Sequence, residues 1–108
     1  MIKIKIEVTG EDIADGQPNN CRECPVAIAA RRAVTMPGLV VYVAQKRRWR
    51  RARLQLVIDE QIMDTIPLSF RASIFITYFD NFGPNSFLVR PFSFFINIER
   101  RKRWTHLI

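Results

Sequence analysis

Three segments of the chain alternate apolar and polar residues with a period of two, at positions 2–9, 52–59 and 92–99. Successive side chains of a strand point to opposite faces, so this pattern is typical of strands that bury one face and leave the other in water. The apolar face of such a sheet has to be covered by other elements. We therefore expect a mostly antiparallel sheet with helices packed on one face.

Two helices are predicted between these strands. The segment 24–34 is rich in alanine, has Pro25 in its first turn, and is ended by Pro37 and Gly38. The segment 69–82 contains many residues that favour strands, but a helix there would be capped by Ser69 and stopped by Gly83. We prefer the helix, whose wide apolar arc indicates a second partner surface.

Two further strands and a loop complete the expected order. The continuous apolar run 39–44 predicts a central strand buried on both faces, paired with 52–59 through a basic hairpin. A short strand is expected at 62–66, and the polar segment 11–20 is expected to be a loop. The acidic residues Glu11, Asp12 and Asp15 in it lack the calcium-loop pattern, so we expect them to solvate the loop or cap a local turn.

The fold class is therefore predicted to be α+β, in the order β-α-β-β-(β)-α-β. A chain of 108 residues fits one domain, which we place at 1–99, followed by a basic C-terminal tail at 100–108. A split βαβ, ferredoxin-like layout is one candidate. No apolar run approaches the roughly 18 residues of a membrane helix, and residues 1–9 do not resemble a secretory signal. We expect a cytoplasmic protein with no membrane partner.

Most of the positive charge lies in two short clusters, K-R-R-W-R-R-A-R at 46–53 and R-R-K-R-W at 100–104. They hold 10 of the 17 basic residues, and the other 7 face 10 acidic residues, so the rest of the chain carries about −3. The cluster residues are Lys46, Arg47, Arg48, Trp49, Arg50, Arg51, Arg53, Arg100, Arg101, Lys102, Arg103 and Trp104.

These clusters predict nucleic-acid binding. Arg and Lys neutralise phosphates, and Trp49 and Trp104 offer surfaces on which unpaired bases can stack. Two alternatives remain open: the clusters form a solvated hairpin tip and tail, or they contact an acidic protein surface. The type of nucleic acid and any base preference do not follow from the sequence.

The cysteines form the motif C-R-E-C at 21–24, where the first helix is expected to start. A helix N-terminus can lower a thiol pKa, but redox motifs of this kind usually follow a buried strand, and here a polar loop precedes. Zinc needs about four ligands, and the only histidine, His106, lies near the far end. We therefore expect Cys21 and Cys24 to pack at the helix start and predict no metal site; a zinc site there would need further ligands.

No other catalytic constellation is present, since both glycine-rich phosphate motifs are missing and a Ser–His or Cys–His pair would have to use His106. We expect a protein that is not an enzyme and has no cofactor or small-molecule substrate. A protein–protein module is the main alternative to nucleic-acid binding. Its interface would be Phe75, Phe79 and Phe82 with the exposed side of the last strand, and its partner a host protein or a second copy in a homodimer.

Four short motifs resemble a family of small phage and prophage proteins: E-D-I-A-D-G at 11–16, C-R-E-C-P-V-A-I-A at 21–29, F-D-N-F-G at 79–83 and R-P-F-S-F at 90–94. The basic cluster at 46–53 and the tail beyond Glu99 depart from that pattern. The resemblance favours the helix at 69–82. It also implies a viral accessory protein in the cytoplasm of an infected bacterium, acting by host–virus interaction rather than catalysis, and it assigns no functional residue.

Overall fold

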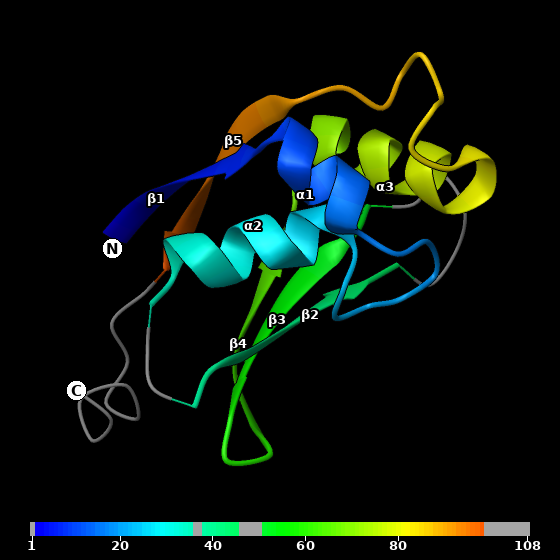
Figure 1. The fold of residues 1–108 in the computed structure, drawn as a ribbon. Helices are drawn as coiled ribbons and strands as arrows, with labels where there is room; N and C mark the ends of the chain where they lie inside the picture. Colours follow the sequence, from blue (N-terminus) through cyan, green and yellow to red (C-terminus); the bar gives the residue numbers. More distant parts are fainter. Residues whose placement is uncertain (1, 36–37, 46–50, 99–108) are drawn as a thin grey trace.

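The computed structural model describes residues 2–35, 38–45 and 51–98, which form two antiparallel sheets and three helices (Figure 1). The elements are β1 (Ile2–Val8), α1 (Gly10–Asp15), α2 (Pro25–Ala33), β2 (Val40–Ala44), β3 (Arg53–Ile58), β4 (Gln61–Pro67), α3 (Phe70–Phe82) and β5 (Phe92–Ile98). In one sheet β1 pairs with β5, and in the other the order is β2-β3-β4. The α+β class and all three alternating strands are confirmed.

One hydrophobic core joins the two sheets, so the described residues form a single domain. Helix α2 packs on both β1 and β2 and thereby bridges the sheets (Figure 1). The side chains of Ile6 in β1, Leu54 in β3 and Phe79 in α3 are completely buried. The alternating residues of β1 and β5 are buried on one face and exposed on the other, as their sequence pattern predicts.

The prediction of one sheet with two helices is wrong, and so is the ferredoxin-like candidate. Within the described residues β1 pairs with β5 alone, and β3 lies between β2 and β4. The cause is the tight turn at Asp59 and Glu60, which both adopt positive φ angles, of 52° and 63°. Such a two-residue turn makes β4 the direct hairpin partner of β3. β4 therefore occupies the edge that β1 would need in the ferredoxin-like arrangement.

The third helix, α1, lies where a loop was predicted. A capping box starts it: the Asp12 N–H donates to Thr9 Oγ1 at 3.2 Å, and the Thr9 N–H donates to Asp12 Oδ2 at 2.9 Å. The helix ends at Gly16, whose N–H donates a hydrogen bond to the carbonyl of Asp12. A Cβ atom at Gly16 would lie 2.6 Å from the ring of Pro25, so only glycine lets α1 and α2 approach this closely. The expectation that the acidic residues cap a local turn holds for Asp12.

The structure corrects the position of β2 and confirms α3. β2 is an edge strand, not a central one, and it alternates between the buried Val41 and Val43 and half-buried neighbours. Helix α3 begins after Ser69, whose Oγ accepts the N–H of Ala72 at 3.2 Å. It ends at Gly83, whose φ of 79° is a conformation that favours glycine. Both helix signals read from the sequence are therefore correct.

Candidate nucleic-acid interface

The structure places only part of the predicted binding residues. Arg51 and Arg53 are described, and both are exposed. The other predicted contacts lie outside the described residues: Lys46, Arg47, Arg48, Trp49, Arg50, Arg100, Arg101, Lys102, Arg103 and Trp104. The pairing of Ala44 with Arg53 confirms that the first basic cluster connects two antiparallel strands, β2 and β3.

The C-terminal end of the first basic cluster is tied firmly to the domain. Arg51 Nε donates to the carbonyl of Leu68 at 2.7 Å. The Ala52 N–H donates to Ser73 Oγ of α3 at 2.9 Å, and the Ala52 carbonyl accepts the N–H of Leu68 at 2.9 Å. The cluster therefore leads into the domain at a fixed point, where the end of β4 meets the start of α3.

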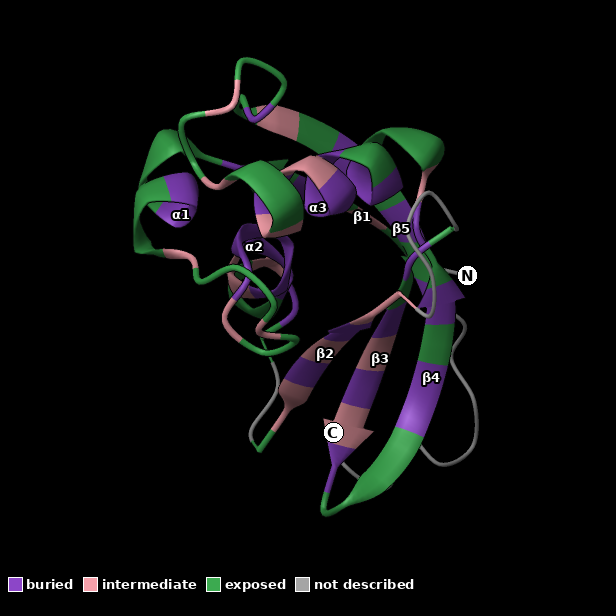
Figure 2. Cartoon of the chain, turned by 90° about the vertical axis from the view of Figure 1, so that its right-hand side faces the viewer, coloured by how far each residue is buried: buried purple, intermediate pink, exposed green. Residues whose placement is uncertain are grey.

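One face of the three-stranded sheet points away from the core; we call it the open sheet face. The strand register sets its residues in three rows, in which every residue is half-buried or exposed. The rows are Val40–Val57–Ile62, Tyr42–Gln55–Thr65 and Ala44–Arg53–Pro67. Figure 2 shows the resulting alternation of buried and more exposed residues along β2 and β3. None of these nine described residues is acidic.

An aromatic–cation pair borders the open sheet face. The guanidinium carbon of Arg22 lies 5.7 Å from the centroid of the Tyr42 ring, within the range of a cation–π contact. The backbone brings the two together, because the Val43 N–H donates to the carbonyl of Cys21 at 2.8 Å and so attaches the loop before α2 to the edge of β2. Together with Arg53, this pair gives the face two cations and one aromatic ring.

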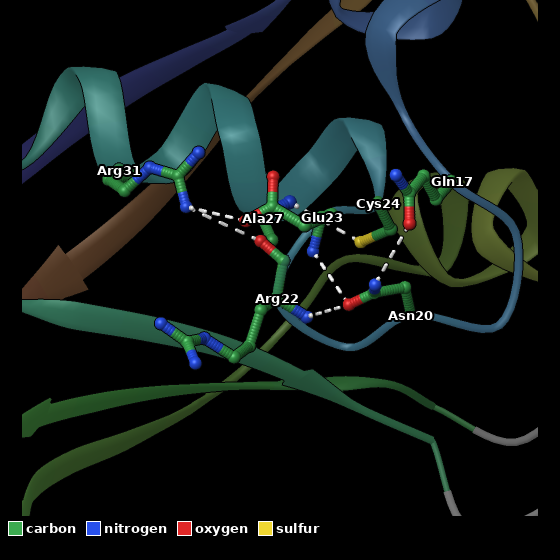
Figure 3. A network of polar contacts seen from close by, with 7 residues as sticks. All are labelled: Gln17, Asn20, Arg22, Glu23, Cys24, Ala27 and Arg31. Carbon is green, nitrogen blue, oxygen red and sulfur yellow. Dashed lines mark hydrogen bonds and ion pairs between the residues drawn. The ribbon is translucent and has the colours of Figure 1, made fainter.

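The loop that carries Arg22 is itself held in place by side chains (Figure 3). Asn20 Oδ1 accepts the backbone N–H groups of Arg22 and Glu23, each at 3.1 Å, and Asn20 Nδ2 donates to Gln17 Oε1 at 3.1 Å. Arg31 of α2 lies 3.5 Å from Glu23 in an exposed ion pair. This network preorganises the loop backbone, so Arg22 projects from a defined position.

The cysteine motif starts α2, as predicted, but its two thiols differ. Cys24 is the N-cap, and its Sγ accepts the Ala27 N–H at 3.4 Å. Burial raises the pKa of the Cys24 thiol to about 11, so the thiol form dominates at neutral pH. Cys21 is exposed, and neither forms a disulfide. Within the described part of the chain, no three Cys, His, Asp or Glu side chains are grouped as metal ligands; His106 lies outside that part.

The predicted protein–protein surface on α3 needs correction. Phe75 and Phe79 are 3% and 0% exposed, so they belong to the core, whereas Phe82 is 65% exposed. The helix instead exposes a stripe of apolar residues spaced four apart on one side. The sequence could not distinguish them from the core residues, because both sets belong to one wide apolar arc. This α3 stripe consists of Phe70, Ile74, Tyr78 and Phe82. On β5, Phe95 is exposed with Lys3 Nζ 4.5 Å from its ring centroid.

Sequence reasoning missed the open sheet face and the Arg22–Tyr42 pair. Both depend on β2 lying at a sheet edge, which the apolar run 39–44 did not reveal. The lone Tyr42 in that run was the available signal, because a polar hydroxyl fits poorly in a strand buried on both faces.

Comparisons with known protein families, with curated proteins and with solved structures found no match to this chain. Among the described residues, no helix has the length and apolar character needed to cross a membrane.

Proposed function

We propose that the protein is a non-enzymatic accessory protein of phage type that binds single-stranded nucleic acid. The binding surface would combine the open sheet face with the basic residues at 46–53 and 100–103. The phage-type part of the proposal rests on the four sequence motifs, and the binding part rests on charge and geometry.

The observation that carries the proposal is where the basic cluster 46–53 joins the domain. It connects β2 to β3, whose open sheet face carries Tyr42 and Arg53, has Arg22 at its border and includes no acidic side chain among its nine described residues. A half-exposed sheet with an aromatic ring is a general platform for unpaired bases, which stack on it while cations contact the phosphates. Double-stranded nucleic acid offers no free base face to Tyr42, so we favour a single strand.

Binding of a fluorescent single-stranded oligonucleotide, followed by anisotropy, tests this proposal. We expect Tyr42→Ala to weaken binding by at least about fivefold, because a stacked base contributes roughly 1–3 kcal/mol, which corresponds to about 5- to 150-fold in affinity. Arg22→Ala should weaken it as well. Arg90→Ala removes an exposed charge in the segment before β5 and serves as the matched control. Equal affinities for Tyr42→Ala, Arg22→Ala and Arg90→Ala would contradict the proposed surface.

The α3 stripe supports a second candidate, a protein–protein module. Phe70 and Phe82 are 72% and 65% exposed at the two ends of the stripe, and Phe87 in the following loop is 73% exposed. Exposed aromatic residues along one side of a helix are typical of protein interfaces. Light scattering of wild type and of a Phe70→Ser, Phe82→Ser variant tests it: a dimer that becomes a monomer would support this candidate.

A further inference from the structure

A small pocket lies where the loop before α2, the end of β2 and helix α3 meet. Its volume is about 180 Å³, and its lining includes Cys21, Val43, Gln45, Ile76 and Asp80. An engineered apolar cavity of about 150 Å³ can hold benzene, so this pocket accommodates one six-membered ring but not a whole nucleotide. Val43 and Ile76 give it apolar walls, while Gln45 and Asp80 make it polar at one side.

The carboxylate of Asp80 is held at a fixed position in this pocket. The backbone N–H of Asn19 donates to Asp80 Oδ1 at 2.9 Å, and Asn19 Nδ2 donates to the Asp80 carbonyl at 3.2 Å. Among the described residues, the hydrogen bond to the carboxylate uses Oδ1. Burial raises the pKa of Asp80, and the hydrogen bond from Asn19 partly offsets this effect. A poorly solvated carboxylate gains from a ligand that donates a hydrogen bond.

The other polar group is positioned too. Gln45 Nε2 donates to Oγ1 of the buried Thr77 at 3.1 Å, which fixes the carboxamide against α3. Gln45 also directly precedes the basic cluster at 46–53, and Cys21 at the pocket precedes Arg22, which contacts Tyr42. Along the chain, the pocket residues are therefore direct neighbours of both the basic cluster and the Arg22–Tyr42 pair.

We propose that this pocket binds one unpaired cytosine base of the bound strand, with Asp80 accepting a hydrogen bond from the exocyclic amino group. This inference rests on the proposed function, since the phosphates of the strand would be held by the basic residues. Aspartate and glutamate are the usual acceptors for the cytosine N4 amino group. Uracil has a carbonyl oxygen at the same place, which the carboxylate repels. The pyrimidine ring would lie between the apolar side chains of Val43 and Ile76.

The experiment compares two octanucleotides, dC8 and dU8, which have the same length and charge and differ only at the pyrimidine edge. We expect the wild-type protein to bind dC8 about tenfold more tightly than dU8. Asp80→Asn should abolish this preference, because the repulsive charge toward uracil is lost and the amide can donate to the uracil carbonyl, while its oxygen can still accept the Asn19 N–H. Asp15→Asn, which removes an exposed carboxylate on α1, is the matched control and should keep the preference.

A second readout on the wild-type protein does not depend on any variant folding. Cys21 is the exposed cysteine and lies at the pocket, so a bound base should slow its alkylation several-fold with dC8 and much less with dU8. Equal binding and equal protection by dC8 and dU8 would overturn the cytosine pocket but leave nucleic-acid binding intact. If neither oligonucleotide binds, both the proposed function and this inference are wrong.

Discussion

Arg32 of α2 forms a bidentate ion pair with the buried carboxylate of Asp12, with Nη1 donating to Oδ1 at 2.7 Å and Nη2 to Oδ2 at 2.8 Å. Nη2 also donates to the carbonyl of Glu7 at 2.8 Å. One guanidinium thus joins α2 to α1 and to the end of β1. Since α2 also forms the bridge between the two sheets, this contact fixes the N-terminal part of the domain.

Removing that guanidinium should cost stability. We expect Arg32→Ala to lower the free energy of unfolding by about 1–3 kcal/mol, because the carboxylate of Asp12 stays buried without its charged partner. Arg31→Ala is the matched control on the same helix. It removes an exposed ion pair to Glu23 and an exposed 3.5 Å hydrogen bond to the Arg22 carbonyl, and should cost less than about 1 kcal/mol. Urea denaturation of both variants checks this; equal losses would contradict the role of Arg32.

The same pair predicts an acid-dependent loss of stability. Burial of Asp12 raises its pKa, but the hydrogen bonds from Arg32 and Thr9 outweigh that effect and hold the pKa below its ordinary value of 3.8. A carboxyl with a lowered pKa stabilises the fold at pH values above the unfolded-state pKa and loses this contribution as the pH falls through the folded-state pKa.

Unfolding of wild type and Asp12→Asn across pH measures this effect. The difference between their free energies of unfolding should be constant above about pH 5 and should shrink below about pH 4. A difference that persists unchanged at pH 2 would show that ionisation of Asp12 does not contribute.

The two cysteines should react at very different rates. Cys24 is buried with its pKa raised to about 11, whereas Cys21 is exposed. Because only the thiolate reacts, one equivalent of a thiol reagent should label Cys21 at pH 8, and Cys24 should react only after denaturation. Mass spectrometry of the labelled peptides identifies each site. Fast labelling of Cys24 in the native protein would be inconsistent with its role as the buried N-cap of α2.

Helix α3 should tolerate polar residues on one side and not on the other. Replacing Phe70 or Phe82 by Ser should change the free energy of unfolding by less than about 1 kcal/mol, because both side chains are already exposed. Phe79→Ala should cost about 3–5 kcal/mol, since its ring is wholly buried. Thermal denaturation of the three variants compares them directly, and a large loss for Phe70→Ser would place that residue in an interface or in the core.

The sequence predicted those parts of the fold that local patterns determine. Alternation revealed β1, β3 and β5, and Ser69 with Gly83 marked the ends of α3. The missed helix α1 had a local signal as well, the T-x-x-D capping box at Thr9 and Asp12, but the surrounding polar residues favoured a loop. Strand order was not readable, because the hairpin at Asp59 and Glu60 decides which strand occupies the free edge of β3.

The candidate site, too, has one part that could be predicted from the sequence and another that could not. The charge clusters were visible in the composition, because they hold most of the basic residues. The open sheet face was not visible, since it exists only when β2, β3 and β4 lie side by side in one register. The contact between Arg22 and Tyr42 joins residues 20 positions apart in the sequence. The backbone hydrogen bond from Val43 to Cys21 brings their two segments together.

The most direct test of nucleic-acid binding is the salt dependence of affinity for a single-stranded oligonucleotide, measured for wild type and for Arg47→Ala, Arg48→Ala, Arg50→Ala combined. Arg51 is kept, because its side chain holds the Leu68 carbonyl. For single strands the slope of log K against log salt changes by about 0.7 for each phosphate contact. We predict a steep slope for wild type and one about 2 units shallower for the variant. Equal affinity and equal slope in both proteins would contradict the proposal.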